Sequence, residues 1–574
     1  MKISKLFPFA CVALMMTACA SDKDEMGGGT RPGSDPQYLA VNIVNVGATP
    51  TTRGTDDYEN GTTEESTIKK VRFYFFNGDG SPYLIKNPGV TGVEGGGNKN
   101  WLEASPADDS STSGTPSQIE KITQTVLVIN GVQSAAPAAI VAVVNPGTVD
   151  AAKIQDGETM RLSELRYSTV GSQFYKKDAT TGAVSDFVMS NSVYVNAGED
   201  VCASLVAGHV TTSEETARTK PVDLYVERVV AKVTADVDKT TFELGNGTNW
   251  DATKYGTKDP VGQSGDYNVY AVIDGWGLAN ENGKAEVEKQ VNKTWADGTL
   301  GFTPWTTTDY HRCFWETSVA FVTGAGGNQP VNPRFNQLKA KMKDVLYTLP
   351  NTPGSKVTDL KNNDLTKFAV AATLRYKDAS GNWNNAEICR YNGVSILGID
   401  NLKKQVALTF SQYYTSTDGT NYTQLSKDDI DFKDPNGTMQ PYLVTPTLAN
   451  DATGTKKYYT KTTSGTTPTF TEVDKDKVLA AIEADKAEIR KDGRAYYYVP
   501  IKHLGGTGEL AEYGIVRNHF YKITLSGITG FGTPVYDPEK VVDPIVPTYE
   551  NTYLAARVQV LQWRVVNQNA SLGN

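Results

Sequence analysis

The feature that most constrains this chain is a succession of short apolar stretches separated by turn-forming residues. Stretches rich in Val, Ile, Tyr and Phe alternate with polar segments that contain Gly, Asn, Asp and Pro. β-Branched and aromatic residues favour extended strands, and turn residues between them are typical of sandwiches. The pattern predicts an all-β protein. The predicted strands are 38–46, 69–77, 124–130, 138–145, 186–195, 222–237, 266–278, 368–376, 404–410, 494–501, 519–528 and 552–566.

Helix is predicted only as minor insertions. Residues 474–490 carry a capping Asp474 and one apolar stripe, so a helix against a sheet is expected there. A second helix is expected over 333–349. The Thr-, Gly- and Asp-rich stretch 412–472 is expected to form long exposed loops.

At 574 residues the chain is too long for a single hydrophobic core, so more than one domain is expected. The polar stretch TTSEETARTKP, residues 211–221, is typical of a link between domains. The expected divisions are a signal peptide (1–18), a propeptide with a removable strand (19–53), an N-terminal β-sandwich (54–220), a C-terminal β-sandwich (221–550) and a C-terminal strand (551–574).

The first residues have the pattern of a lipoprotein export signal. Lys2 and Lys5 precede the apolar stretch LFPFACVALMM, and small residues lead to Cys19. The thiol of Cys19 would carry the lipid; the alternative is an ordinary signal peptide cut near Ala18 or Ala20. A lipid group anchors a precursor to a membrane without making it a spanning protein. No later apolar run reaches the length that a bilayer requires.

Charge and cysteine content exclude several classes of protein. The net charge is −9, and no basic stripe is available to neutralise nucleic-acid phosphates. Beyond Cys19 three cysteines remain in the exported chain, so at most one disulfide could form and buried thiols are expected. The fold must therefore rest on large cores. These cysteines are Cys202, Cys313 and Cys389.

No segment makes a good case for catalysis, a metal or a cofactor. His311 and Cys313 would share one face of a strand, but nothing nearby supplies the further ligands of a zinc site. The acidic run KDDIDF (427–432) lacks the Gly and closing Glu of a calcium loop. GGTGEL (505–510) has no lysine to hold a phosphate and is expected to be a loop. The protein is therefore not expected to be an enzyme.

Two distant segments resemble each other. QYLAVNIVNVG (37–47) and TYLAARVQVLQWRVVNQ (552–568) both begin a strand with Tyr-Leu-Ala, and both switch apolar side chains from one face to the other partway along. They are candidates for the same groove. The apolar positions of the early strand are Tyr38, Leu39, Val41, Ile43, Val44 and Val46, and those of the late strand are Tyr553, Leu554, Ala556, Val558, Val560, Leu561, Trp563 and Val565.

The region after the early strand predicts how it could be removed. Arg53 lies in the polar stretch PTTRGTDDYENG, the kind of segment that proteases cut. By contrast, Arg31 precedes a proline and Arg72 lies inside a predicted strand. A cut between Arg53 and Gly54 would release the early strand and open a sheet to a strand from another copy. Head-to-tail exchange of this kind does not close, so it produces filaments.

Several segments resemble a Bacteroidales fimbrillin of the type V pilus, most closely the shaft subunits of the minor (Mfa) fimbria. They are the region around Cys19, YLAVNIVNVGATPTTRGTDD (38–57), VERVVAKV (226–233), AYYYVPI (495–501), YGIVRNHFYKITLSGI (513–528) and VQVLQWRVV (558–566). The resemblance implies two transthyretin-like β-sandwich domains and export to the outer membrane as a palmitate-bearing lipoprotein. It also implies cleavage by an Arg-specific protease and assembly with further copies and accessory fimbrial subunits by donor-strand exchange.

Two alternatives remain open. The chain could be the tip adhesin of such a fibre, or a surface lipoprotein that binds glycans. Trp276, Trp305, Trp315 and Trp383 could line sugar sites, although core packing explains them as well.

Overall fold

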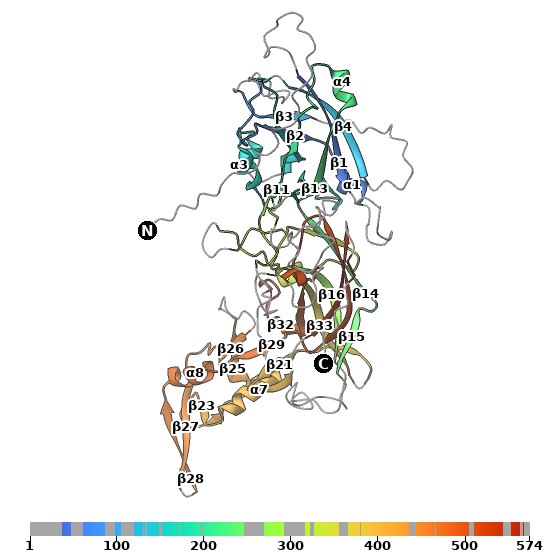
Figure 1. Cartoon of the computed structure of the whole chain (residues 1–574). Helices are drawn as coiled ribbons and strands as arrows, with labels where there is room; N and C mark the ends of the chain where they lie inside the picture. The colour runs from blue at the N-terminus through green and yellow to red at the C-terminus, as the bar shows by residue number, and fades with distance from the viewer. Residues whose placement is uncertain are drawn as a thin grey trace, which may run out of the picture.

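The computed structural model is an elongated, mostly β molecule with short helices, so the predicted all-β class is confirmed (Figure 1). It describes residues 37–46, 61–86, 98–104, 120–129, 131–132, 135–148, 152–171, 173–196, 199–245, 269–291, 316–321, 327–354, 365–378, 380–434, 443–464, 466–503, 510–542, 553–562 and 566–567. The predicted domain boundaries remain predictions.

The N-terminal part of the chain forms an eight-stranded sheet at one end of the molecule (Figure 1). Its main path is β3 (Trp101–Ala104), β2 (Val71–Phe76), β5 (Ala139–Val144), β9 (Met189–Asn191), β13 (Val222–Arg228), β1 (Gln37–Val46) and β4 (Glu120–Ile129), and β12 (Ser204–Leu205) joins β5. The first strand of the chain therefore lies inside the sheet, although the strands beside it come much later in the sequence.

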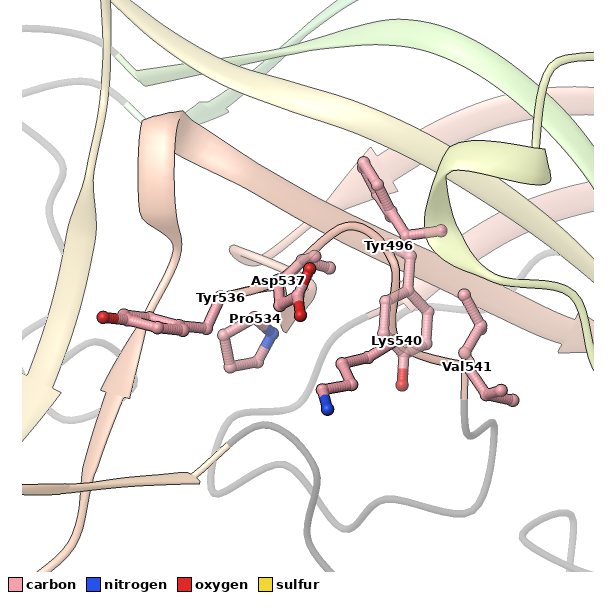
Figure 2. A pocket seen from close by; sticks show the side chains of 9 residues that line it. Tyr496, Pro534, Tyr536, Asp537, Lys540 and Val541 are labelled. Atoms are coloured by element: carbon pink, nitrogen blue, oxygen red, sulfur yellow. The ribbon is translucent and has the colours of Figure 1, made fainter. Parts of the chain in front are cut away.

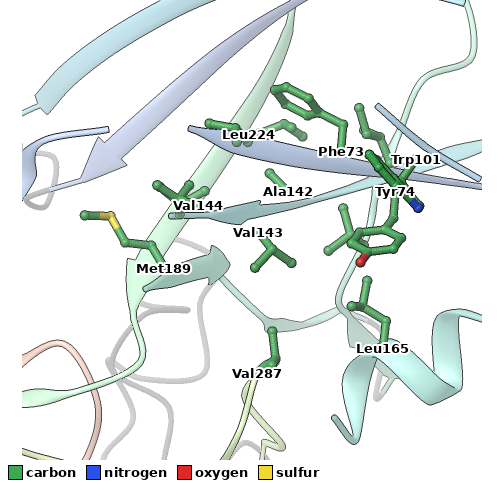
Figure 3. Close-up of a cluster of buried hydrophobic side chains, with 14 of the residues drawn as sticks. Phe73, Tyr74, Trp101, Ala142, Val143, Val144, Leu165, Met189, Leu224 and Val287 are labelled. Carbon is green, nitrogen blue, oxygen red and sulfur yellow. The ribbon is translucent and has the colours of Figure 1, made fainter. Parts of the chain in front are cut away.

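The sheet packs on a hydrophobic core that Figure 3 shows in part. Every residue of β2 and β5 is buried, because segments of the chain cover both faces of these central strands. Phe73, Val143 and Met189 are fully buried there, and Leu165 of a short helix reaches the same cluster. Val287 also belongs to it, which shows that a later segment of the chain completes the N-terminal core.

Two further sheets, whose strands lie between residues 231 and 567, face each other as a β-sandwich. Their inward side chains form one core, with Val233 and Tyr521 from one sheet and Trp276 and Val370 from the other. The first sheet is β18 (Val345–Thr348), β14 (Ala231–Val237), β31 (His519–Thr529), β33 (Tyr553–Gln562) and β34 (Val566–Asn567). The second is β15 (Thr241–Gly245), β16 (Val269–Ala279), β19 (Lys367–Lys377), β30 (Arg494–Pro500) and β32 (Thr533–Pro534), with β20 (Trp383–Asn385) beside β19.

A third cluster of buried residues lies in an insert between β20 and β30, which projects from the sandwich (Figure 1). Val406, Tyr458 and Ile482 are among its buried residues. One sheet of the insert is β22 (Val394–Leu397), β21 (Ile388–Tyr391), β29 (Ala487–Ile489), β26 (Leu443–Leu448) and β25 (Ile430–Lys433). The other is β24 (Thr423–Gln424), β23 (Tyr413–Ser416), β27 (Lys457–Ser464) and β28 (Thr467–Val473), and the helices are α7 (Ile399–Thr409) and α8 (Lys475–Glu483).

The remaining elements are short. Three two-stranded ribbons pair β6 (Thr169–Val170) with β17 (Ala285–Glu286), β7 (Lys176–Lys177) with β8 (Val184–Ser185), and β10 (Tyr194–Asn196) with β11 (Glu199–Val201). The short helices are α1 (Thr63–Ser66), α2 (Ala152–Gln155), α3 (Leu162–Arg166) and α4 (Glu214–Thr219). The 3₁₀ turns are Pro146–Thr148, Phe335–Gln337, Lys427–Asp429, Lys491–Gly493 and Leu510–Glu512.

Several predicted elements are wrong, and each error has a physical reason. The stretch 412–472 contains strands β23 to β28 rather than long loops, because its Thr and Tyr residues pair across a sheet. The predicted strand 404–410 belongs to helix α7, whose Leu402 and Val406 are buried at helical spacing. The predicted helix 333–349 is a 3₁₀ turn followed by β18, and Lys343 between them has a positive φ of 75°.

Two other predicted elements have different bounds from those expected. Helix α8 begins after Asp474, whose side chain accepts a hydrogen bond from the Asp476 amide, so the predicted cap is confirmed. The helix ends at Glu483, because residues 487–489 join β21 and β26 as β29. The predicted strand 222–237 is two strands, β13 and β14, which belong to different sheets.

Candidate functional site

The early strand of the sequence, β1, lies between two strands of the N-terminal sheet. It runs parallel to β13, with Val41 opposite Val222, and antiparallel to β4, with Leu39 opposite Leu127. It therefore contributes two ladders of backbone hydrogen bonds, as an interior strand does and an edge strand does not.

The position of β4 makes this arrangement unusual. Within the described part of the chain, β4 pairs with β1 alone, along the whole length of β1 from Gln37 to Val46. Without β1 the sheet would be divided into β4 on one side and β13 with its neighbours on the other. We refer to the space that β1 fills between β13 and β4 as the acceptor groove.

The side chains at the start of β1 are part of the N-terminal core. Leu39, Ala40 and Val41 are all fully buried, and Leu127 and Val222 on either side are buried as well. Burial of a large aliphatic side chain contributes about 1.5–3 kcal/mol. A strand that fills the groove must therefore supply apolar side chains at the places of Leu39 and Val41.

The late strand of the sequence, β33, lies in a different sheet. It pairs antiparallel with β31, from His519 opposite Gln562 to Thr529 opposite Tyr553, and the register shifts between Leu525 and Gly527. The backbone of the predicted donor residues from Tyr553 to Leu561 is thus placed on the C-terminal sandwich of the same chain, away from the acceptor groove (Figure 1).

Some predicted site residues lie outside the described residues. These are Cys19, Arg53, Gly54, Trp563 and Val565, so lipidation, cleavage and the end of the donor strand remain predictions. Among the residues that the structure describes, no helix combines the length and apolar character needed to cross a bilayer.

A group of buried charges joins the two main parts of the molecule, and the sequence analysis did not single out these residues. Arg228 ends β13 and donates to Asn518 Oδ1 at 3.1 Å, just before β31. The ion pair between Lys289 and Glu227 measures 3.0 Å and both side chains are fully buried. Arg517 and Glu316 form a second buried pair at 2.9 Å. The available signal was the placing of charged residues inside the apolar segments VERVVAKV and YGIVRNHF.

Burial sets the protonation of the groups around this junction. The pKa of Glu288 is raised to about 8 because its carboxyl group is removed from water, and the nearby Arg166 and Arg517 offset this only in part. Burial also lowers the pKa of His519 to about 3, and its Nδ1 lies 2.7 Å from the Arg517 carbonyl oxygen. Both groups are therefore neutral at neutral pH.

The other candidate chemistries find no support in the described residues. No cluster of three or more His, Cys, Asp or Glu there could hold a metal ion. Asp429 accepts from Ser426 and pairs with Lys456 at 2.7 Å, so it stabilises a 3₁₀ turn. The thiols of Cys202 and Cys389 are buried and form no disulfide, whereas His311 and Cys313 lie outside the described residues.

One small pocket opens where the segment 533–542 crosses the outer face of the second sheet of the sandwich (Figure 2). This segment is fastened there by backbone bonds: the Phe335 amide donates to the Lys540 carbonyl, and the Val542 amide donates to the Pro333 carbonyl. The pocket thus lies where these bonds hold the chain against the sheet, before its C-terminal strand. Its lining is Phe335, Tyr496, Pro534, Val535, Tyr536, Asp537, Lys540, Val541 and Val542.

Of the four tryptophans named for a glycan site, the structure describes Trp276 and Trp383. Trp276 is fully buried in the sandwich core and donates its indole N–H to the Lys341 carbonyl. Trp383 is 44% exposed, with Tyr270 edge-on at 5.1 Å and Lys377 over its ring. Trp305 and Trp315 lie outside the described residues.

Comparison with known proteins bears on the segment that contains β30, β31 and the tail strand β33. Residues 490–569 match the family described as "Major fimbrial subunit protein type IV, Fimbrillin, C-terminal". This segment is similar to a fimbrillin C-terminal region. The predicted resemblance to the fimbrillins is therefore confirmed, and the fimbrillin region includes both the strand that holds the tail and the tail itself. No curated protein sequence matches the chain.

Solved structures show only distant similarity. A fimbrillin from Porphyromonas gingivalis W83 is 12% identical over 92% of this chain and 98% of that chain, with a TM-score of 0.34. The tip fimbrial protein Mfa3 from Porphyromonas gingivalis, with a C-terminal truncation, is 10% identical over 92% and 100%, with a TM-score of 0.27. A fimbrial assembly protein from Parabacteroides distasonis ATCC 8503 is 11% identical over 61% and 85%, with a TM-score of 0.25. The similarity to the fimbrillins therefore rests on the match over residues 490–569.

Proposed function

We propose that this protein is the shaft subunit of a cell-surface fimbria, closest in kind to the minor (Mfa) fimbria, and that it polymerises by donor-strand exchange. The observation that carries the proposal is the place of β1, which fills the groove between β13 and β4 and is the one described partner of β4. Removal of β1 leaves a slot with two unpaired edges. A strand from another copy can occupy that slot and restore both ladders.

The tail strand of a second copy can place apolar side chains at the same positions as the first half of β1. When the two Tyr-Leu-Ala sequences are aligned, Leu554 takes the place of Leu39 and Ala556 that of Val41. Val558 then takes the place of Ile43, whose neighbour on β13 is the fully buried Leu224. A tail strand in this register runs parallel to β13 and antiparallel to β4, as β1 does.

The free energy of such an exchange is adequate. The apolar side chains of the tail strand together contribute on the order of 10 kcal/mol before the cost of ordering the strand. The tail also gives up its pairing with β31, so the net driving force is the difference between two similar strand contacts. Removal of the covalently attached β1 supplies the bias, because an attached strand has a far higher effective concentration than a strand from another molecule.

Export and processing complete the proposed cycle. Cys19 would hold the precursor at the outer membrane by its lipid, and an Arg-specific protease would cut between Arg53 and Gly54. The cut point lies in the short segment between the end of β1 and the start of α1. One cut would thus remove the lipid and β1 together, and it would leave α1 on the mature chain. The mature subunits would then join one another and accessory subunits in an extracellular fibre that supports adhesion.

N-terminal sequencing of protein sheared from the cell surface tests the proposal directly. The assembled subunit should begin at Gly54, and electron microscopy of the same sample should show filaments. A labelled synthetic peptide of residues 552–568 should bind the trimmed protein and not the uncut precursor, whose groove holds β1. Filaments built from subunits that still contain residues 37–46 would contradict the proposal.

A further inference from the structure

The short helix α1 is the first described element after β1. It lies at the junction between the N-terminal sheet and the sandwich. Glu65 of α1 is fully buried. Its carboxylate accepts hydrogen bonds from the Thr62 amide at 2.9 Å and from the Tyr347 hydroxyl, and Lys232 Nζ lies 2.8 Å from its Oε1 atom. Lys232 belongs to β14 and Tyr347 to β18, so one carboxylate fastens α1 to two strands of the sandwich.

The same helix also contacts the end of β13, one of the two strands that border the acceptor groove. Arg228, the last residue of β13, donates from Nε to the Glu65 carbonyl oxygen at 2.8 Å and from Nη2 to Ser66 Oγ at 3.0 Å. Arg228 also donates from Nη1 to Asn518 Oδ1 at 3.1 Å. Arg228 is therefore fixed by α1 on one side and by the residue before β31 on the other.

None of these contacts involves the strand that would be removed. The last residue of β13 that pairs with β1 is Val226, opposite Asn45, and Arg228 lies beyond it. Glu65, Arg228 and Lys232 all follow Gly54 in sequence and remain on the trimmed chain. The fastening of β13 at the junction thus outlasts the loss of β1.

We propose that Glu65 is a positioning residue of the acceptor groove: through Arg228 and Lys232 it holds the end of β13 in place after β1 has left, so that the groove stays open for the incoming strand. The inference rests on the proposed donor-strand exchange. A groove that keeps its shape binds a strand without first paying the cost of reopening. If β13 were held at this end by its ladder with β9 alone, it could move toward β4 and close the slot.

Charge is the reason why Glu65 in particular has this role. Burial by itself would raise the pKa of Glu65, but Lys232, Tyr347 and Arg228 together hold that pKa below its ordinary value. The carboxylate is therefore charged, and its loss would leave two buried cations without their counter-ion. Glu65→Gln keeps the shape of the side chain and removes only this charge, so it separates positioning from packing.

The experiment compares Glu65→Gln with a matched control, Glu103→Gln. Glu103 forms a similar pair with Arg72 at 2.8 Å, but on β3, at the opposite edge of the same sheet. Full-length wild-type and variant proteins are cut after Arg53, and uptake of a fluorescent peptide of residues 552–568 is followed by anisotropy. Hydrogen exchange of β13 is measured by mass spectrometry before and after the cut.

The expected result is that the uncut Glu65→Gln protein folds and exchanges like the wild type in β13, because β1 still holds that strand. After the cut, its β13 exchanges faster, and peptide affinity falls about tenfold or more, while Glu103→Gln binds like the wild type. Equal affinity of Glu65→Gln and wild type overturns the inference, as does an equal loss in Glu103→Gln. A cut wild-type protein that neither takes up the peptide nor forms filaments refutes donor-strand exchange itself.

Tyr347→Phe keeps the test decisive if Glu65→Gln does not fold. This variant removes one hydrogen bond to Glu65 and leaves the ion pair with Lys232 intact. It should fold and bind the peptide a few-fold more weakly than wild type after the cut. Wild-type affinity in Tyr347→Phe, together with an unfolded Glu65→Gln, would assign Glu65 to folding alone and overturn the inference.

Discussion

Leu39→Ala in the uncut precursor should loosen β1 and, with it, the whole of β4. Leu39 is fully buried and lies opposite Leu127, which is 3% exposed, so truncation removes apolar contact and leaves a cavity between two strands. Substitutions of this kind cost about 2–5 kcal/mol. Because β4 has no other strand partner in the described part of the chain, it must share the loss.

Hydrogen exchange of the amides in residues 120–129 measures this effect locally. A loss of about 3 kcal/mol corresponds to roughly a hundredfold increase in the population of the opened state, since every 1.4 kcal/mol is a factor of ten. The exchange rates of the protected β4 amides should rise by about that factor. The variant precursor should also take up a peptide of residues 552–568 without any proteolytic cut, because its own strand competes less well for the groove.

Leu205→Ala is the matched control. Leu205 lies on β12 of the same sheet but is 66% exposed, so its truncation should change stability by no more than about 0.5 kcal/mol. Unchanged exchange of β4 in Leu39→Ala would refute the reasoning, because it would show that β4 is held by something other than β1. Equal effects of the two substitutions would refute it as well.

Three further outcomes are expected. Arg53→Ala should leave a lipidated, uncut monomer in the membrane fraction, and normal fibres from this variant would show that the cut lies elsewhere. Deletion of residues 552–574 should give trimmed monomers that fold but do not join; polymers by electron microscopy would rule out the tail as donor. Burial raises the pKa of Glu288 to about 8, so the native state retains a proton that the unfolded chain loses above about pH 4.5. Stability should therefore fall as the pH rises from about 5 to 8, by up to about 1.4 kcal/mol per pH unit, and Glu288→Gln should flatten that slope in urea titrations.

The sequence predicted those strands in which the apolar pattern and the backbone preferences of the residues agree. The strands β2, β5, β19 and β31 lie where the Val-, Phe- and Ile-rich stretches indicate, because burial of their side chains and the extended backbone favour the same state. The resemblance between β1 and the tail strand was also visible, since it depends on residue identity alone. What each strand pairs with could not be predicted in this way.

The insert shows where local pattern fails. Residues 412–472 are rich in Thr, Gly and Asp, and this composition suggested loops, but Thr460 and Thr471 face each other across a β ladder. Tyr458 and Tyr459 provide the buried contacts that order the hairpin. In and just after α7 the apolar residues Val406, Ala407 and Phe410 are too few to distinguish a strand from a helix. Gly398, with a φ of 85°, is the N-cap of this helix.

The junction charges were missed for a related reason. Sequence reasoning treats charged residues in a strand as marks of its exposed face, yet Glu227, Arg228 and Lys232 are all buried. They lie where one continuous apolar stretch divides into β13 and β14, and each pairs with a partner distant in sequence. Such pairs become visible only when the strands that carry them are placed side by side.

The direction of β1 has a consequence for how subunits would be arranged in the proposed fibre. β13 runs toward the junction, where Arg228 meets Asn518, and β1 is parallel to it. A tail strand that replaces β1 in the same direction therefore enters the groove at the end far from the junction.

The segment 543–552 that leads to the tail strand can span at most about 35 Å, so the anchored Val542 of the donor must lie within that distance of the outer end of the acceptor groove. The sandwich of one subunit would thus stand beyond the N-terminal sheet of the next. With the opposite strand direction the segment would emerge beside the acceptor's own sandwich, so the parallel pairing of β1 with β13 favours a head-to-tail fibre.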